Sequence, residues 1–273
     1  MNKVLAILMA ILFVCLACEP LPEEPEYDNP EDKEKNPDYI APETDIVSGP
    51  GEGEELTSHT VTFEFSGNEN VQEYSYRLDD EDWSAWQEVS TVTFEYLDED
   101  DHSFQVMGRY NQDDEDETPA IRNFTVNAIQ GPALRFFPRK INTTSGSTFS
   151  VEIYAEEVVD MMGVSLEIST SDIPVDIISY QILDQDGDFL LQNGGNVITL
   201  DEQDGTVSLV LNIAVSNSDP AGLSGSGAIV RMEMELTSSE NAEVNFNELS
   251  EMQNSEIQDI EINELVPLKI FVE

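Results

Sequence analysis

The sequence has few of the residues from which catalytic and metal sites are most often built. Its 273 residues include two cysteines and two histidines. Both cysteines lie within the first 18 residues, so the rest of the chain has no thiol nucleophile, thiolate ligand or disulfide. His59 and His102 lie in no recognisable nucleophile motif, although a serine-histidine-acid site needs a positioned histidine. The scarcity of these residue types favours a protein that is not an enzyme.

Basic residues are also scarce. The chain has 11 Lys plus Arg against 57 Asp plus Glu, a net charge of −46. Such a chain repels nucleic-acid phosphates and anionic lipid headgroups, which argues against direct binding to either polyanion. The acidity instead suits a solvated surface in a saline medium, where counter-ions screen the self-repulsion.

One long apolar run is present, from Val4 to Ala17 in "MNKVLAILMAILFVCLACEP". It is too short for a comfortable membrane span and is typical of a secretory signal, which we assign to residues 1–17. "CLAC" resembles a bacterial lipobox, although Cys15 and Leu16 depart from its preferred residues. The resemblance implies a lipidated Cys18 and an anchor in the envelope of a Gram-negative bacterium, at its outer membrane or surface. An ordinary secretory signal cleaved nearby is the alternative.

Residues 18–54 are predicted to form a disordered acidic tether. Prolines at 20, 22, 25, 30, 37, 42 and 50 interrupt regular structure, and the acidic residues keep the segment extended. Acidic residues soon after the acceptor cysteine also resemble the surface-export signals of Bacteroidetes-type lipoproteins.

Beyond the tether, the apolar pattern has period two. "TVTFEFSG", "EYSYRL", "TVTFEY", "SFQVMGRY" and "RNFTVNA" each place apolar residues on one face, with acidic turns between them. This pattern predicts a β-sandwich over residues 55–129. The stretch "YSYRLDDEDWSAWQE" resembles bacterial immunoglobulin-like and fibronectin-type-III-like modules.

A second sandwich is predicted over residues 132–273. Its strands include "TFSVEIYA", "GVSLEIS", "VDIISY", "NVITL", "TVSLVLNIAV" and "AIVRMEMEL". "NELSEMQNSEIQD" supplies one short helix at most. The predicted fold class is all-β, with two tandem β-sandwich domains after a signal peptide and a tether. Paired carboxylates for glycoside hydrolysis would need a cleft, which small sandwiches seldom provide.

The glycines of "GLSGSGAIVRMEMEL" do not indicate a phosphate site. A phosphate-binding loop runs into a helix N-terminus, whereas here the apolar residues after the glycines alternate as in a strand. No lysine follows the glycines. We therefore expect a turn leading into a half-buried strand.

The strand order of the second module, with its Gly-x-Gly turn before "AIVRMEMEL", is similar to that of cohesins and related carbohydrate-binding sandwiches. Cohesins bind dockerins through one exposed sheet face, and the resemblance implies a face built from "GVSLEIS", "TVSLVLNIA" and "AIVRMEMEL". Alternation along these strands turns the polar partners of the core residues outward. The candidate partner-binding residues are Val210, Asn212, Ala214, Arg231, Glu233 and Glu167. A merely solvated face is the alternative.

Two further features are weighed against simpler interpretations. Asp184, Asp186 and Asp188 in "LDQDGDF" are candidate calcium ligands, but their spacing differs from an EF-hand loop, so solvated acidic turns are favoured. Trp83 and Trp86 in "DWSAW" are candidates for glycan stacking, against partial burial in the core. No cofactor is indicated.

The sequence thus leaves three functions open. The leading hypothesis is a non-catalytic, envelope-anchored binding protein whose cohesin-like module docks a dockerin-like protein partner. The alternatives are direct carbohydrate binding for polysaccharide capture, and a passive structural spacer.

Overall fold

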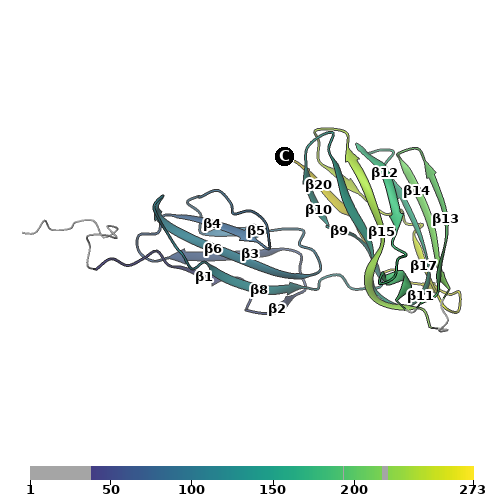
Figure 1. Cartoon of the computed structure of the whole chain (residues 1–273), viewed down its shortest axis with the longest axis horizontal. Coiled ribbons are helices and arrows are strands. Elements are labelled where there is room, and N and C mark those ends of the chain that lie inside the picture. Colours follow the sequence, from purple (N-terminus) through teal and green to yellow (C-terminus); the bar gives the residue numbers. More distant parts are fainter. Residues whose placement is uncertain (1–37, 193, 217–220) are drawn as a thin grey trace, which may run out of the picture.

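The protein is all-β and consists of two β-sandwiches in tandem, as predicted (Figure 1). The computed structural model describes residues 38–192, 194–216 and 221–273. We call β1 to β8 the N-terminal sandwich and β9 to β20 the C-terminal sandwich. The predicted signal peptide (1–17), Cys18 and the first part of the predicted tether lie outside the described residues.

The N-terminal sandwich packs a three-stranded sheet, β1-β3-β5, against a second sheet, β2-β8-β6-β4, to which β7 is paired. Its strands are β1 (Thr44–Ser48), β2 (Glu54–Leu56), β3 (Val61–Gly67), β4 (Glu73–Leu78), β5 (Thr91–Phe94), β6 (Asp101–Asn111), β7 (Asp114–Glu115) and β8 (Ala120–Val126). The core between the sheets is aromatic: the rings of Phe63 and Phe104 are stacked with centroids 4.0 Å apart, and Phe124 packs beside them. Phe63, Phe104 and Phe124, which the period-two pattern predicted to share the apolar face of their strands, therefore lie in the core between the sheets.

The N-terminal sandwich begins earlier than residue 55, inside the segment predicted to be tether. Thr44–Ser48 form β1, which pairs antiparallel with β3, and Ile46 packs against the core. The physical reason is that Pro42 and Pro50 flank a proline-free segment containing three β-branched residues, Thr44, Ile46 and Val47.

The C-terminal sandwich contains a large sheet of order β12-β15-β11-β14-β13, with β9, β17, β18 and β19 attached, and a small sheet of order β10-β20-β16. Its elements are β9 (Ala133–Phe137), β10 (Lys140–Thr143), β11 (Thr148–Ser169), β12 (Val175–Ile182), the 3₁₀ turn η1 (Phe189–Leu191), β13 (Asn196–Asp204), β14 (Ser208–Ser216), β15 (Leu223–Leu236), β16 (Ala242–Val244), β17 (Glu251–Asn254), β18 (Asp259–Ile260), β19 (Glu264–Val266) and β20 (Leu268–Val272). The segment considered for a short helix forms β17 instead.

Strand β11 contains both "TFSVEIYA" and "GVSLEIS", which were predicted as separate strands. It pairs with different strands along its two parts. Its first part, residues 148–161, pairs with β15, whereas residues 163–169 pair with β14. Near the end of the first part, between Ala155 and Met161, the register with β15 shifts, and Glu157 and Asp160 have φ values of 48° and 59°. Such left-handed residues are uncommon and mark a sharp local bend.

Gly222 and the glycine-serine stretch at the start of β15 hold this bend in place. Asp160 accepts hydrogen bonds from the Gly222 backbone N–H at 2.6 Å and from the Ser255 hydroxyl at 2.7 Å. In return, the Asp160 N–H donates to the Ser224 hydroxyl, and the Glu157 N–H donates to the Ser226 hydroxyl. We expected a turn leading into the strand, but from Leu223 onward the stretch already belongs to β15 and pairs with β11. Its serines satisfy backbone groups that the bend leaves without ladder partners.

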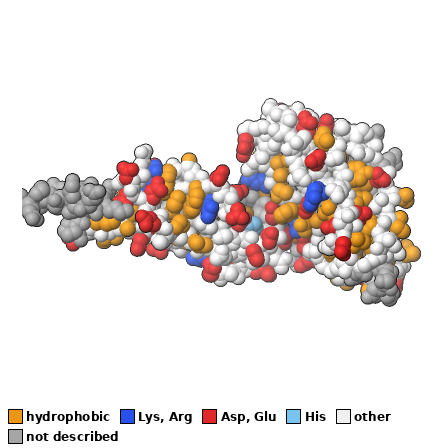
Figure 2. Space-filling view, viewed as in Figure 1, with side chains coloured by type: hydrophobic (Ala, Val, Ile, Leu, Met, Phe, Trp, Pro, Cys, Tyr) orange, Lys and Arg blue, Asp and Glu red, His pale blue; other side chains and the backbone are white. Residues whose placement is uncertain are grey.

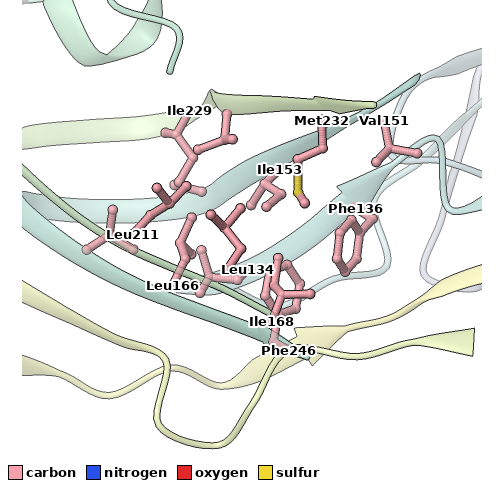
Figure 3. Close-up of a cluster of buried hydrophobic side chains, with 14 of the residues drawn as sticks. Leu134, Phe136, Val151, Ile153, Leu166, Ile168, Leu211, Ile229, Met232 and Phe246 are labelled. Atoms are coloured by element: carbon pink, nitrogen blue, oxygen red, sulfur yellow. The ribbon is translucent and has the colours of Figure 1, made fainter. Parts of the chain in front are cut away.

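One core fills the C-terminal sandwich. Figure 3 shows Met232 and Ile229 of β15, Leu211 of β14 and Leu166 of β11 gathered in one buried cluster. Phe246 closes the cluster at one side by stacking on Phe136, with ring centroids 4.5 Å apart.

The two sandwiches contact each other through the loop between β5 and β6. The Arg139 backbone N–H donates to the Asp98 carboxylate at 2.8 Å, and Glu99 accepts the backbone N–H of Ala128 at 2.9 Å. The Tyr96 ring lies 5.8 Å from that of Phe271. The carboxylates of Asp98 and Glu99 therefore satisfy backbone donors of the connecting segment and hold it in place.

Both histidines lie at this junction and both have internal partners. His102 is buried, with Nδ1 2.9 Å from the Asp79 carboxylate and Nε2 3.1 Å from the Asp98 carbonyl. Burial opposes the charged form, but these two acceptors outweigh it and raise the pKa of His102. Burial and then the charge of Arg139 lower the pKa of His59 to about 4.

We expect Gly222→Ala to destabilise the protein by about 1–3 kcal/mol, the usual cost of overpacking. A Cβ at Gly222 would lie 2.4 Å from the backbone carbonyl carbon of Asp160. Gly163→Ala is the matched control in β11, because its Cβ would meet only the Ile213 carbonyl oxygen, at 3.6 Å. Urea unfolding followed by circular dichroism measures both, and equal midpoints would contradict this account of the bend.

We expect the two histidines to titrate in opposite directions from the ordinary value of 6.5, His59 near 4 and His102 above 6.5. Since the folded pKa of His59 is depressed, its contribution to stability is lost as pH falls from about 6.5 towards 4. The contribution of His102 is lost as pH rises through its folded pKa. NMR titration of the ring protons, assigned with His59→Gln, tests this. Two coincident titrations near 6.5 would refute it.

Candidate functional site

The outer face of strands β13, β14, β11 and β17 forms a shallow groove of about 200 Å³. We call it the sheet groove. Figure 2 shows hydrophobic side chains gathered on the part of the C-terminal sandwich where Figure 1 places these strands. Each strand contributes the residues that alternation turns away from the core.

The strand registers arrange the sheet groove as two rows that cross all four strands. The first row is Ile198, Ala214, Gly163 and Gln253, and the second is Leu200, Asn212, Ser165 and Glu251. In both rows the two central positions carry small side chains, and the outer positions carry large ones. The groove therefore has a low floor on β14 and β11, an aliphatic wall on β13 and a polar wall on β17.

The aliphatic wall is unusually exposed for its residue types. Ile198 is 58% exposed and Leu200 is 72% exposed. Single exposed aliphatic residues are common, but here two stand on one strand beside a common hollow. A groove with one apolar wall and polar margins is the usual anatomy of a protein contact surface.

Three of the predicted partner-binding residues lie on β14, and they point outward. Asn212 and Ala214 are exposed and form part of the groove floor, and Val210 is half-buried beside them. Glu167 lies opposite Val210 in the register and accepts a hydrogen bond from the Asn247 side chain at 3.3 Å. The structure therefore brings Val210, Asn212, Ala214 and Glu167 onto one face.

Arg231 and Glu233, predicted for the same face, do not join it. They lie on β15, which pairs with the other part of β11, and their neighbours are different residues. Arg231 donates to Glu152 at 2.6 Å, and Glu233 accepts from Ser179 at 3.2 Å. The reason is the bend in β11, because alternation gives the direction of a side chain but not the part of a bent sheet to which its strand belongs.

Sequence reasoning missed the walls of the groove. Ile198 and Leu200 lie in "NVITL", which was predicted as a strand without a decision on which residues face out. Glu251 and Gln253 lie in β17, within the segment considered for a helix. No local signal marks the first pair, because apolar residues at alternate positions predict burial, whereas Ile198 and Leu200 are exposed.

The two tryptophans lie in the loop between β4 and β5, which folds back onto β4 through a hydrogen bond from the Ser84 N–H to the Tyr76 carbonyl. Both indoles are half-buried. The Arg77 guanidinium lies 4.9 Å from the Trp83 ring centroid, and that of Arg109 lies 4.3 Å from the Trp86 ring centroid. Part of each indole is thus occupied by a cation–π contact within the sandwich.

The candidate calcium aspartates are spread along the turn before η1. Asp184 and Asp186 are exposed, and Asp188 accepts the Gln185 backbone N–H at 2.7 Å within the turn. Among residues 38–192, 194–216 and 221–273, no group of three or more His, Cys, Asp or Glu side chains is arranged to hold a metal ion.

The predicted lipid attachment site, Cys18, is outside the described residues. Within the part of the chain that the structure describes, no helix is both long and apolar enough to cross a membrane.

Comparison with solved structures finds cohesin domains. A non-cellulosomal cohesin from the archaeon Archaeoglobus fulgidus is 13% identical, with a TM-score of 0.38, over 52% of this chain and 91% of that one. The sixth cohesin of scaffoldin B from Acetivibrio cellulolyticus, in complex with a Cel5 dockerin, is 12% identical, with a TM-score of 0.40, over 53% of this chain and 100% of that one. A type I cohesin–dockerin complex from Clostridium thermocellum is 10% identical, with a TM-score of 0.39, over 52% and 96%.

No protein-family model and no curated protein matches this sequence. The similarity to the cohesin domains is one of fold and assigns neither a partner nor an activity to this chain.

Proposed function

We propose that this chain is a non-catalytic binding protein that docks a protein partner in the sheet groove. The observation that carries the proposal is the pair of rows in which small floor residues lie between Ile198 and Leu200 on one side and Gln253 and Glu251 on the other. These residues stand on hydrogen-bonded strands, so the surface is preorganised and binding costs little ordering entropy.

The width of the sheet groove suits an α-helix lying along the strands. The walls on β13 and β17 are separated by β14 and β11, which makes three strand spacings, or about 14 Å. A helix with its side chains is about 10–12 Å across. Gly163 and Ala214 let such a helix approach the floor closely, while Ile198 and Leu200 offer the apolar contact that a helix-in-groove interface needs.

The charge of the groove margins limits the kind of helix. Glu251 and Glu167 lie on this face, and the whole chain has a net charge of −46. A partner helix with aliphatic residues on its contact face and Lys or Arg at its flanks is complementary, and its association is faster at low salt. A dockerin-like helical partner, the hypothesis drawn from the sequence, fits this description.

We place the protein in the cell envelope of a Gram-negative bacterium, at its outer membrane or surface, anchored by a lipid on Cys18. The support is the apolar run before "CLAC" and the proline-rich acidic segment after it. In this arrangement the N-terminal sandwich separates the docking face from the membrane.

We expect Ala214→Trp to weaken partner binding at least about 30-fold, the factor that corresponds to loss of a roughly 2 kcal/mol hot spot. The indole would fill the groove floor, and the exposed position leaves the core untouched. The full chain, immobilised on resin, serves as the bait. The partner that it retains from extracts of the source organism is purified, and the Kd of this partner for the wild type and for the variant is measured by calorimetry.

Ile121→Trp is the matched control, since Ile121 is 52% exposed on β8 of the N-terminal sandwich. We expect it to retain wild-type affinity. A partner that binds Ala214→Trp as tightly as the wild type would rule out the sheet groove as its docking site.

A further inference from the structure

A second hollow lies away from the sheet groove, at the junction of the two sandwiches. It measures about 770 Å³, within the range of roughly 300–1,000 Å³ that is typical of small-molecule sites. Its floor is the outer face of β6 and β8, and Phe137 of β9 contributes from the C-terminal sandwich. We call it the junction hollow.

The floor is built from neutral hydrogen-bonding side chains on paired strands. Ser103 lies opposite Asn123, and Gln105 follows Ser103 on the same face of β6. Thr125 completes the floor and donates to Asp101 at 2.6 Å. Because the ladder between β6 and β8 fixes these positions, the array is preorganised in the way that a binding site requires.

Several of these groups keep hydrogen-bonding capacity for a ligand. Arg77 donates twice to Oε1 of Gln105, at 3.0 and 3.3 Å, which orients the amide, and Nε2 of Gln105 donates to no described residue. Asn123 donates through Nδ2 to Glu52 at 2.8 Å, which leaves its Oδ1 as an acceptor. The floor therefore presents both a fixed donor and a fixed acceptor.

The acidic walls of the hollow disfavour a negatively charged ligand. Asp79, Asp80, Asp98 and Asp100 line the hollow, so phosphate, sulfate and uronate groups are repelled. Carboxylates accept strong hydrogen bonds from hydroxyl groups. The half-buried ring of Phe137 adds apolar surface beside them, and the wall thus suits a molecule with many hydroxyls and apolar C–H faces.

We propose that the junction hollow binds a neutral oligosaccharide, with Gln105 and Asn123 hydrogen-bonding its hydroxyls and the Phe137 ring against a sugar face. The hollow lies on the same sheet as Arg77 and Arg109, which contact the tryptophans, but neither tryptophan lines it. The site is independent of the docking proposal, so either proposal can fail while the other stands.

The test is binding of the full-length protein to neutral polysaccharides. The probes are soluble β-glucan, xylan, mannan and starch, with polygalacturonate as the anionic comparison, measured by affinity electrophoresis and then by calorimetry on derived oligosaccharides. We expect retention by at least one neutral probe and none by polygalacturonate. We expect Gln105→Ala and Asn123→Ala each to weaken binding about tenfold or more.

Gln181→Ala is the matched control, because Gln181 is an exposed glutamine on β12 of the other sandwich. It should bind as the wild type does, and unchanged melting temperatures of all three variants show that they are folded. The proposal is overturned by failure of all neutral probes, by equal retention of the Gln105 and Asn123 variants, or by a site that takes calcium alone.

Discussion

The bend in β11 is the constraint on which the C-terminal sandwich depends. One strand of 22 residues pairs with β15 over its first part and with β14 over its second. Near the end of the first part, the backbone at Glu157 and Asp160 leaves the ladder with β15, and its polar groups must find other partners. Asp160, the hydroxyls of Ser224 and Ser226 and the Gly222 N–H supply them. Glycine is needed at 222 because backbone atoms of Asp160 occupy the space of a Cβ.

This bend also determines which surfaces exist. Because β14 and β15 share one core yet pair with different parts of β11, their outward residues belong to separate surfaces. The sheet groove forms where β14, β17 and β13 assemble around the second part of the strand. Its floor is low because Gly163 and Ala214 are neighbours in the register, and its aliphatic wall is the exposed strand β13.

A second set of contacts relates the two sandwiches. The loop from Tyr96 to Glu99 reaches across to Arg139 and Phe271, and Glu99 holds the connecting segment through backbone N–H groups. The same loop forms one wall of the junction hollow. The acidic residues of this region have two roles. Some accept hydrogen bonds from backbone N–H groups, and others give the margin of the hollow a strongly negative charge.

The sequence predicted much of the fold because a single signal dominates it. Alternation along "TVTFEFSG" or "TVSLVLNIAV" is forced by the two-residue period of a strand, and the residues it put inside, such as Phe63 and Leu211, are fully buried. The same signal turned Asn212 and Ala214 outward, as the structure has them. This signal was less reliable in the proline-rich segment. There the prolines led to the prediction of a tether, to which Thr44–Ser48 were assigned.

What the sequence determined by itself is the all-β class, the acidic surface and the outward direction of residues in the strands with clear apolar alternation, because these follow from local period and composition. Tertiary structure alone decided which strands are neighbours. Arg231 and Ala214 have the same local pattern, yet only Ala214 lies in the sheet groove, since the pairing of β11 with β15 and then with β14 is a long-range choice. Ile198 lines the sheet groove, and Gln105 lines the junction hollow, only because strands distant in the sequence lie together in the folded protein.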